Sequence, residues 1–417
     1  MNPTNQILNI IFVTPYRPDI VRVRPYQFIR HLSKLGHKVT LVYYDSPDKL
    51  IPGEELKSIC QNIYAFPLTK LRAIVNCSFC LLTKKPLQAA YGLNKKMANH
   101  LIDLIRNEKI LFDLIHFEHL RSVEFGRNLI KNNPQSRIKM IWDSVDSITH
   151  LFRQAARQHP MWAGRKFLEF ETNRTAKYEP YFASLFDKVL VTSKKDQQIF
   201  NDLLQKENLK ADINVVANGV DLEYFGVNQT RTREKDTLVI SGKMSYHANQ
   251  RMVEKIVLEI MPLIWQKKPS VKLWIVGQNP SQDIINFGND PRILVTGYVD
   301  DIRPYLMNAT IAVAPLAYGA GIQNKILEAM ACSTPVIASP IALQALSAIP
   351  GQDLLSAEDT QSFANAVIGL LSDPDRCEKI GNAGRLFVEN HHTWKIATEK
   401  LVEIYQESIK SLDSLYS

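Results

Sequence analysis

The stretch TIAVAPLAYGAGIQNKILEAMA, residues 310–331, has the pattern of a strand, a loop and a helix in immediate succession. Its apolar first part is typical of a parallel strand buried on both faces, and helical spacing begins at Ile322 or Gln323. The first N–H groups of a helix lack intrahelical partners, so such a junction can bind an anion. Gly319 and Gly321 allow a ligand to approach the loop backbone closely. The stretch therefore indicates an α/β domain that binds a phosphate group.

Two charged residues extend this candidate site into the helix. Lys325 adds a positive charge one turn in, although a side chain of this length can equally be solvated. Glu328 lies seven residues beyond Gly321 and can accept hydrogen bonds from two neighbouring hydroxyls, as in a ribose. Alternatively, it only complements the helix dipole. The backbone of GYVDD, residues 297–301 around Val299, ends a neighbouring strand and is expected to contact a base, so this half predicts a nucleotide site.

The alternation of strands and helices runs along the chain twice. In the first series ILNIIFVT, residues 7–14, predicts a buried strand, and a helix ending at Gly36 and the strand HKVTLVYYD follow it. A second series starts near residue 213, after a break around residues 200–235. We therefore predict an α/β protein with two Rossmann-like domains facing each other across a cleft that holds the ligand.

The length of 417 residues also favours two domains, because it exceeds one typical hydrophobic core. We expect the N-terminal domain to comprise residues 1–212 and the C-terminal domain residues 213–390. Residues 391–417 complete the chain with an amphipathic helix, whose simplest role is to pack on a core.

Composition and charge restrict the class of protein. Hydrophobic residues make up 45% and charged residues 22%, as in ordinary globular proteins. Five scattered cysteines argue against a disulfide framework, and the lone pair Cys77 and Cys80 lacks the two further ligands of a zinc site. Residues 1–180 contain 27 Lys and Arg but 15 Asp and Glu, a net charge of +12, whereas the remainder carries −4. Such a basic half suits an anionic membrane surface or a phosphate-bearing substrate, and no nucleic-acid-binding motif accompanies it.

Targeting signals are absent from the sequence as it stands. No basic segment precedes the first apolar run, and no run approaches the about 20 apolar residues of a membrane span. We therefore expect a cytoplasmic protein, at most peripheral to the inner face of the membrane. The segment KLRAIVNCSFCLLTKKP, residues 70–86, has an apolar centre and basic ends, so it could lie on a membrane or guide a lipid acceptor. The alternative is a buried helix with basic ends.

Familiar phosphate-binding fingerprints are missing, because neither a G-x-G-x-x-G after the first strand of either half nor a P-loop is present. Five segments, in the right order, instead resemble the retaining glycosyltransferases of family 4, which have the GT-B fold. They are NGVDLEYF (218–225), SGKMSYHANQ (241–250), GYVDDIRPYL (297–306), GAGIQNKILEAMACSTPVIAS (319–339) and the closing TWKIATEKLVEIY. In the first half ILNIIFVTPYRP, FDLIHFEHLRS, IWDSVDS and FDKVLVTSKKD are similar to a subgroup of bacterial sugar transferases.

The resemblance implies a transferase that moves a sugar from a nucleotide diphosphate sugar to a saccharide or lipid-linked acceptor. It implies retention of the anomeric configuration, no metal or other cofactor, and a place in cell-surface or exopolysaccharide synthesis. The C-terminal domain would bind the donor, the N-terminal domain the acceptor, and the closing helix would cross back to the N-terminal domain. Of the family's two acids Glu328 is retained and expected on the ribose, whereas Ala320 replaces the acid that contacts the transferred sugar. The backbone of residues 319–323 is then expected to hold the donor.

The positive charges expected around the diphosphate also depart from the family. Lys243, after Gly242, retains one phosphate-binding cation, but Asn249 replaces the second. Lys325 is our candidate replacement, with Arg251 behind it. We expect Lys243 and Lys325, together with the helix N-terminus, to stabilise the leaving diphosphate.

Candidate residues of the N-terminal domain come from two loops. Arg22 and Arg24 of DIVRVRP stand where the family often has paired glycines, and we expect them to clamp a phosphate of the donor or of a lipid-linked acceptor. The alternative is ion pairs with the helix that follows. In HFEHL the family's sugar-contacting histidine corresponds to His119, then Glu118, then His116, in that order of preference. A purely structural role is the alternative for each.

Two further functions are consistent with the sequence. The loss of an acid at Ala320 favours a catalytically impaired scaffold or regulatory subunit of a polysaccharide assembly. A nucleotide sugar epimerase would share the fold, but the order of the segments fits it less well.

Overall fold

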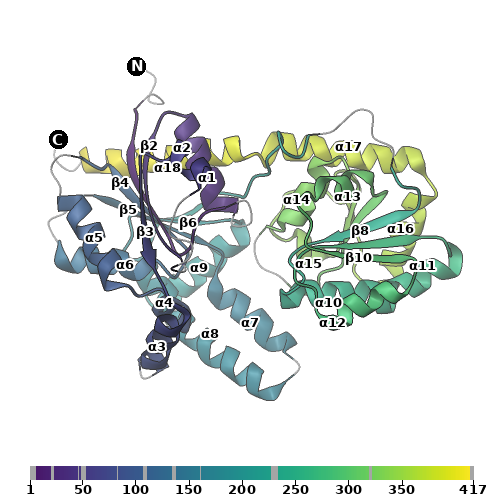
Figure 1. Cartoon of the computed structure of the whole chain (residues 1–417), viewed down its shortest axis with the longest axis horizontal. Coiled ribbons are helices and arrows are strands. Elements are labelled where there is room, and N and C mark those ends of the chain that lie inside the picture. The colour runs from purple at the N-terminus through teal and green to yellow at the C-terminus, as the bar shows by residue number, and fades with distance from the viewer. Residues whose placement is uncertain are drawn as a thin grey trace. The chain divides into compact units, whose positions relative to one another are not determined.

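The computed structural model describes most of the chain. The described residues are 6–19, 23–45, 47, 53–81, 83–106, 110–133, 138–159, 161–226, 233–318 and 322–413. The chain divides into a first unit, Met1–Ala217 with Ala397–Ser417, and a second unit, Asn218–Ile396 (Figure 1).

The first unit contains a parallel sheet of seven strands in the order β3-β2-β1-β4-β5-β6-β7. Its inner strands are almost completely buried, which explains why β1 reads as a continuous apolar run rather than an alternating one. The strands are β1 Asn9–Thr14, β2 Lys38–Asp45, β3 Asn62–Pro67, β4 Leu114–Glu118, β5 Lys139–Val145, β6 Lys188–Val191 and β7 Ile213–Val215.

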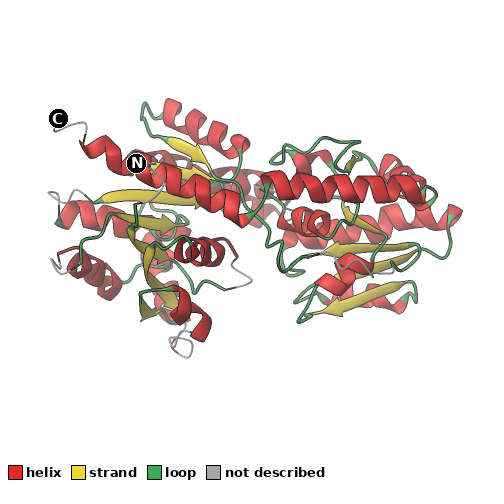
Figure 2. Ribbon diagram, turned by 90° about the horizontal axis from the view of Figure 1, so that it is seen from above, coloured by secondary structure: helices red, strands yellow, loops and turns green. Residues whose placement is uncertain are grey.

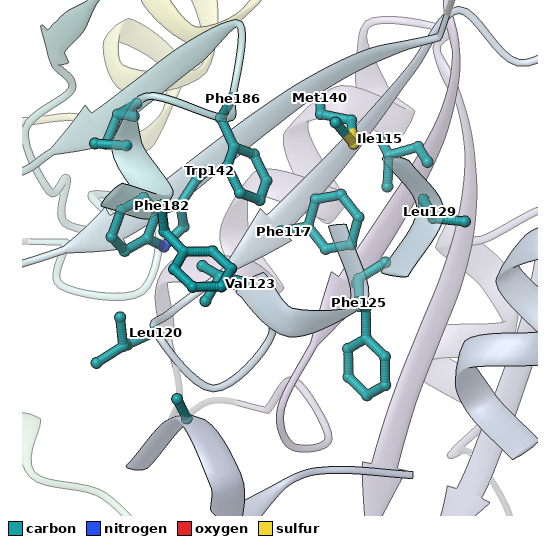
Figure 3. Packing of buried hydrophobic residues seen from close by; sticks show 14 of the residues in the cluster. Ile115, Phe117, Leu120, Val123, Phe125, Leu129, Met140, Trp142, Phe182 and Phe186 are labelled. Atoms are coloured by element: carbon teal, nitrogen blue, oxygen red, sulfur yellow. The ribbon is translucent and has the colours of Figure 1, made fainter. Parts of the chain in front are cut away.

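Helices cover this sheet and close its core. They are α1 Val23–Lys34, α2 Glu54–Ile59, α3 Lys70–Leu81, α4 Leu87–Tyr91, α5 Lys95–Arg106, α6 Val123–Asn132, α7 Ile148–Gln158, α8 Trp162–Ala183 and α9 Lys194–Lys206. One core cluster lies under α6 and α8, where Phe186 contacts Phe117 edge to face and also packs near Trp142 (Figure 3). Aromatic pairs of this kind stabilise the fold beyond their buried area.

The domain boundary differs from the expected one. The strand that begins at Ile213 does not open the second domain but pairs in parallel with β6, so that it completes the first sheet. The Val216 N–H extends this pairing by donating to the carbonyl of Val191 at 2.9 Å. An unpaired strand edge leaves backbone groups unsatisfied, which favours this addition over a place in the next domain. The closing helix α18, Trp394–Asp413, belongs to the first unit from Ala397 onward.

The second unit contains a parallel sheet of six strands in the order β10-β9-β8-β11-β12-β13. The strands are β8 Thr237–Ser241, β9 Lys272–Val276, β10 Ile293–Gly297, β11 Ile311–Ala314, β12 Val336–Ala338 and β13 Leu355–Ser356. The helices are α10 His247–Lys255, a π-helical turn Ile256–Ile260, α11 Met261–Lys267, α12 Gln282–Asn286, a 3-10 turn Phe287–Asn289, α13 Arg303–Asn308, α14 Asn324–Ala331, α15 Pro340–Leu343, α16 Thr360–Leu371 and α17 Pro374–His391.

Each sheet reverses its strand order once. The chain leaves β1 toward β2 and β3 and then returns to the other side at β4, and it leaves β8 toward β9 and β10 before returning at β11. Helices flank the strands of both sheets (Figure 2). In open α/β sheets ligands bind beyond the carboxyl ends of the strands at such a reversal, so the two reversals locate the candidate sites.

Candidate active site

The reversal between β8 and β11 brings together the segments that the sequence singled out. Gly242 and Lys243 follow the carboxyl end of β8, and α14 follows the carboxyl end of β11. The three residues Gly319, Ala320 and Gly321 lie outside the described residues, so the expected roles of this loop stay predictions.

Two glycines allow the strand ends beneath this site to approach each other closely. Gly242 has φ 148° and Gly277, after the neighbouring β9, has φ 151°, a region that residues with a side chain rarely adopt. A Cβ atom on Gly277 would lie 1.7 Å from the carbonyl oxygen of Gly242. The close approach of the two strand ends therefore requires glycine at Gly277. Gly242 has a structural reason of its own, because a Cβ atom there would lie 2.8 Å from Nδ2 of Asn249.

Asn249 of α10 joins the two sides of the reversal. Its buried amide donates from Nδ2 to the carbonyl oxygen of Lys243 at 2.9 Å, and its Oδ1 accepts from Lys325 Nζ at 2.5 Å. In the sequence Asn249 stands where the family has its second phosphate-binding cation. In the structure it orients the residue expected to replace that cation, so one amide positions both Lys243 and Lys325. The side chain of Lys243 itself is exposed at the edge of the sheet.

Lys325 and Glu328 occupy the first turns of α14 and are both half-buried. Burial lowers the pKa of Lys325 to about 8 against the opposing effect of Glu328. Burial likewise raises the pKa of Glu328 to about 7, and Lys325 partly offsets this. Within the described part of the chain no hydrogen bond or ion pair reaches the Glu328 carboxylate. A half-buried carboxylate in this position is suited to accept hydrogen bonds from hydroxyl groups of a ligand.

A second contact across the reversal was not anticipated. Tyr318, which precedes the undescribed loop, hydrogen-bonds through its hydroxyl to Nδ1 of His247 at the start of α10. Burial, with a contribution from Tyr246, raises the pKa of Tyr318 to about 12, so the phenol stays protonated. The only signal in the sequence was position, because both residues follow the carboxyl ends of strands that become neighbours only in the folded sheet.

The remaining donor candidates lie at the same edge. Ile322 is buried, and Gln323 is the N-cap residue of α14. Asn324 accepts a hydrogen bond from the amide of Asn218 at 3.2 Å, which fixes the start of the helix. Val299 is half-buried two residues beyond the end of β10. The structure thus places the described donor candidates at the carboxyl edge of one sheet.

In the first unit the reversal between β1 and β4 carries Glu118 and His119. Tyr16, in the loop after β1, donates to Oε1 of the buried Glu118 at 2.8 Å, so a tyrosine spans this reversal. His119 has a positive φ of 65°, and burial with the nearby Arg121 lowers its pKa to about 3. The imidazole is therefore neutral at physiological pH, and its Nδ1 accepts from the Arg121 N–H at 3.4 Å. Both residues lie at the carboxyl end of β4, as the sequence predicted, but His119 is half-buried whereas Glu118 is almost fully enclosed.

Two expectations for the first unit are corrected. Arg24 is buried and binds both carboxylate oxygens of Asp143 on β5, at 2.8 and 3.1 Å, and the carbonyl oxygen of Val216 at 3.0 Å. It therefore does not present its guanidinium to a phosphate, and its ion pair is with a strand rather than with the following helix. Arg22 lies outside the described residues.

His116 is likewise structural, because it has no exposed surface. Its ring stacks on Phe12, and its Nδ1 hydrogen-bonds to the Tyr405 hydroxyl of α18 at 2.6 Å. Burial lowers its pKa to about 4, with Asp143 opposing the shift and Arg24 adding to it. A side chain enclosed in this way cannot contact an acceptor; instead it attaches the closing helix to the first sheet.

The N–H groups at the start of helix α7 donate hydrogen bonds to side chains of the same unit. The buried Glu179 carboxylate accepts from the N–H groups of Ile148 and Thr149, at 2.7 and 3.2 Å, and Ser147 caps the helix from its side chain. Ser147 and Glu179 together order the start of α7. No helix of the described residues is long and apolar enough to cross a membrane, and these residues form no cluster of three or more metal-ligating side chains.

Parts of this chain are similar in sequence to known glycosyltransferases. Residues 235–373 match the family model described as glycosyl transferases group 1. CapM, a capsular polysaccharide biosynthesis glycosyltransferase of Staphylococcus aureus, is 24% identical over 242 residues, covering 54% of this chain and 62% of CapM. An alpha-maltose-1-phosphate synthase of Mycolicibacterium smegmatis is 38% identical over 115 residues, 25% of this chain and 29% of the synthase. The chain thus spans less than two thirds of either relative.

Solved structures resemble the chain over nearly its whole length. Sucrose-phosphate synthase from Thermosynechococcus elongatus has a TM-score of 0.70 at 16% identity, covering 97% of this chain and 100% of the synthase. HepE of Anabaena, solved in complex with UDP and glucose, has a TM-score of 0.66 at 13% identity, covering 96% of this chain and 100% of HepE. The chain therefore has the GT-B fold of two Rossmann-like domains, as predicted. The matched C-terminal segment, residues 235–373, is similar to the group 1 glycosyltransferases.

Proposed function

We propose that this protein transfers a sugar from a nucleotide diphosphate sugar to a saccharide or lipid-linked acceptor, with retention of the anomeric configuration. The observation that carries the proposal is the arrangement at the β8/β11 reversal, where Glu328, Lys325 and Asn249 meet on α14 and α10. CapM is named as a capsular polysaccharide biosynthesis glycosyltransferase, which supports a polysaccharide product. HepE was solved in complex with UDP and glucose, which supports a nucleotide sugar donor.

In the proposed reaction the ribose hydroxyls donate to Glu328, and the diphosphate lies near Lys243, Lys325 and the start of α14. These groups stabilise the negative charge that develops on the leaving diphosphate, which is the main electrostatic demand of the step. We assign no residue as nucleophile for a double displacement. We propose front-side attack by the acceptor, whose proton passes to the departing phosphate. We also propose that no metal ion takes part, and that the first unit binds the acceptor near Glu118 and His119.

A screen of UDP-, GDP- and ADP-sugars by thermal shift tests the donor site. One donor is expected to raise the melting temperature of the wild type and to lose this effect in Glu328→Ala. The matched control is Glu378→Ala, because Glu378 is an exposed acid on α17 of the same unit. Equal stabilisation of wild type and Glu328→Ala by the donor would remove Glu328 from the ribose.

Transfer itself is tested with the donor so identified. Lys243→Ala and Lys325→Ala are each expected to lower kcat by about a hundredfold, the usual cost of one group that stabilises transition-state charge. NMR of the anomeric proton in the product reports retention or inversion. Near wild-type turnover in both variants would contradict the phosphate assignment.

A second candidate function is that of an impaired scaffold or regulatory subunit of a polysaccharide assembly. It is favoured by Ala320, which stands in place of the expected acid. Donor hydrolysis or sugar transfer by the purified protein would reject it. Release of a free, altered sugar nucleotide would instead favour an epimerase.

A further inference from the structure

Helix α3 exposes an apolar surface that the proposed reaction does not use. Of its twelve residues only Ala73 and Cys80 are buried. Leu71, Ile74 and Phe79 are exposed to 72%, 63% and 71% of their surface. Single exposed apolar residues are ordinary, but several on one short helix mark a binding surface. The structure thereby contradicts the alternative of a buried helix.

Buried contacts fix α3 in this orientation. Arg174 of α8 donates to the carbonyl oxygen of Cys80 at 2.6 Å and forms an ion pair with Glu171 at 2.9 Å. Glu171 in turn accepts from the N–H of Leu87 at 2.8 Å, which holds the start of α4. The C-terminal end of α3 is therefore anchored to α8 by a satisfied ionic network, so the outer face of α3 is held outward.

The apolar surface continues beyond α3. A shallow cavity of about 260 Å³ lies between α3, α4 and α8 and is lined by residues that include Leu81, Tyr91 and Phe167. Trp162, at the start of the same helix α8, is exposed to 73%. Figure 1 shows α3 and the hairpin of α7 and α8 projecting from the same end of the first unit. We name Leu71, Ile74, Phe79, Phe167 and Trp162 the apolar face.

The charges around this face are mainly basic. Residues 56–102, which contain α3, α4 and most of α5, include seven Lys or Arg and no Asp or Glu. On the hairpin, Arg153, Arg157 and Arg165 line a second cavity of about 580 Å³ together with the single acid Glu169. Within the described residues no ion pair joins these three arginines to an acid. An apolar surface with a basic rim, and with tryptophan and tyrosine at its border, has the composition of a membrane-interface surface.

We propose that the apolar face docks this protein on a membrane surface containing anionic lipids. The side chains of α3 enter the boundary between headgroups and acyl chains, and the surrounding lysines and arginines attract the negative surface. A second copy of the chain is a less suitable occupant, since two copies meeting through this face would oppose basic residues to basic residues. The proposal concerns the first unit alone and does not depend on the donor site.

Flotation of the full-length protein with vesicles tests the proposal. Neutral phosphatidylcholine vesicles and vesicles with added phosphatidylglycerol are compared at 50 and 500 mM salt, values chosen to vary screening. The wild type is expected to float with the anionic vesicles at low salt, and Ile74→Asp/Phe79→Asp to bind them at least tenfold more weakly. The control Leu258→Asp alters an equally exposed apolar residue of the second unit and is expected to float like the wild type.

A charge variant separates the two components of binding. Lys70→Glu/Arg72→Glu is expected to lose the salt-sensitive part of vesicle binding. If Ile74→Asp/Phe79→Asp fails to fold, Phe79→Ser replaces it. Absence of flotation by the wild type, or equal flotation by the α3 variants, would overturn the proposal. So would conversion of an oligomer to a monomer by these variants without any effect of lipid, because the face would then be a protein interface. Thermal shift with a nucleotide sugar, unchanged in the α3 variants, keeps this test separate from that of the donor site.

Discussion

Lys325 donates a hydrogen bond to the side-chain amide of Asn249 across the reversal between β8 and β11, and the same amide holds the carbonyl of Lys243. The helix that follows one strand is thereby linked to the loop that follows another. An asparagine, rather than a second cation, positions the positive charge of the candidate donor site.

We predict that Asn249→Asp weakens donor binding without unfolding the protein. Aspartate still accepts from Lys325, but it cannot donate to the Lys243 carbonyl, and it adds a negative charge beside the expected diphosphate. Donor affinity should fall about tenfold or more because like charges are brought together. The free energy of unfolding in urea should change by only about 1 kcal/mol, the usual worth of one hydrogen bond. Unchanged donor affinity would contradict the role given to this amide.

Glu328→Gln should stabilise the protein at alkaline pH and weaken donor binding. The folded-state pKa of Glu328 is raised to about 7 from an ordinary 4.5, so the folded state retains a proton that the unfolded state loses between these values. Stability of the wild type therefore falls as pH rises through this window. The advantage of Glu328→Gln in urea unfolding should grow from pH 5 to pH 8, while donor affinity drops. Glu378→Gln is the control, and a constant difference between Glu328→Gln and wild type would refute the burial of this charge.

Gly277→Ala should destabilise the second unit severely. The added methyl group would lie 1.7 Å from the carbonyl oxygen of Gly242, and the backbone has φ 151°. We expect a loss of about 3 kcal/mol or more from steric overlap and strain together. Gly369→Ala is the matched control, because nothing lies within 4 Å of its added methyl group in α16. This control should gain about 0.5–1 kcal/mol from helix propensity, as measured by thermal unfolding.

Arg24→Met should destabilise the first unit by about 3–5 kcal/mol, since it leaves the buried Asp143 carboxylate without the guanidinium that binds both of its oxygens. Adding Asp143→Leu to this variant should recover part of the loss, because both charges are then removed. Arg251→Met, which breaks the exposed pair with Glu254, should cost at most about 1 kcal/mol. An Arg24→Met protein that unfolds like the wild type would show that the pair contributes little.

The sequence determined the repeating units of this protein. Periodicity and continuous apolar runs predicted the two α/β domains, because a strand buried on both faces is apolar along its centre, as β1 and β8 are. The positions of Lys243, Lys325 and Glu328 after strand ends followed from the same pattern, since the carboxyl ends of parallel strands share one edge. The resemblance to a known family added the nucleotide sugar, which composition and spacing alone did not reveal.

Only the tertiary structure decided which charged side chains are enclosed and which are presented. Arg24 and His116 looked like ligands in sequence, but Asp143 from β5 and Tyr405 from α18 enclose them, and these partners lie 119 and 289 residues away. The place of the edge strand at Ile213 was likewise decided by the tertiary structure. Its partner in the first sheet is β6, and local periodicity does not identify the partner of a strand. Local sequence sets the period of each element, whereas the burial of a charge depends on elements that become neighbours only when the sheet has formed.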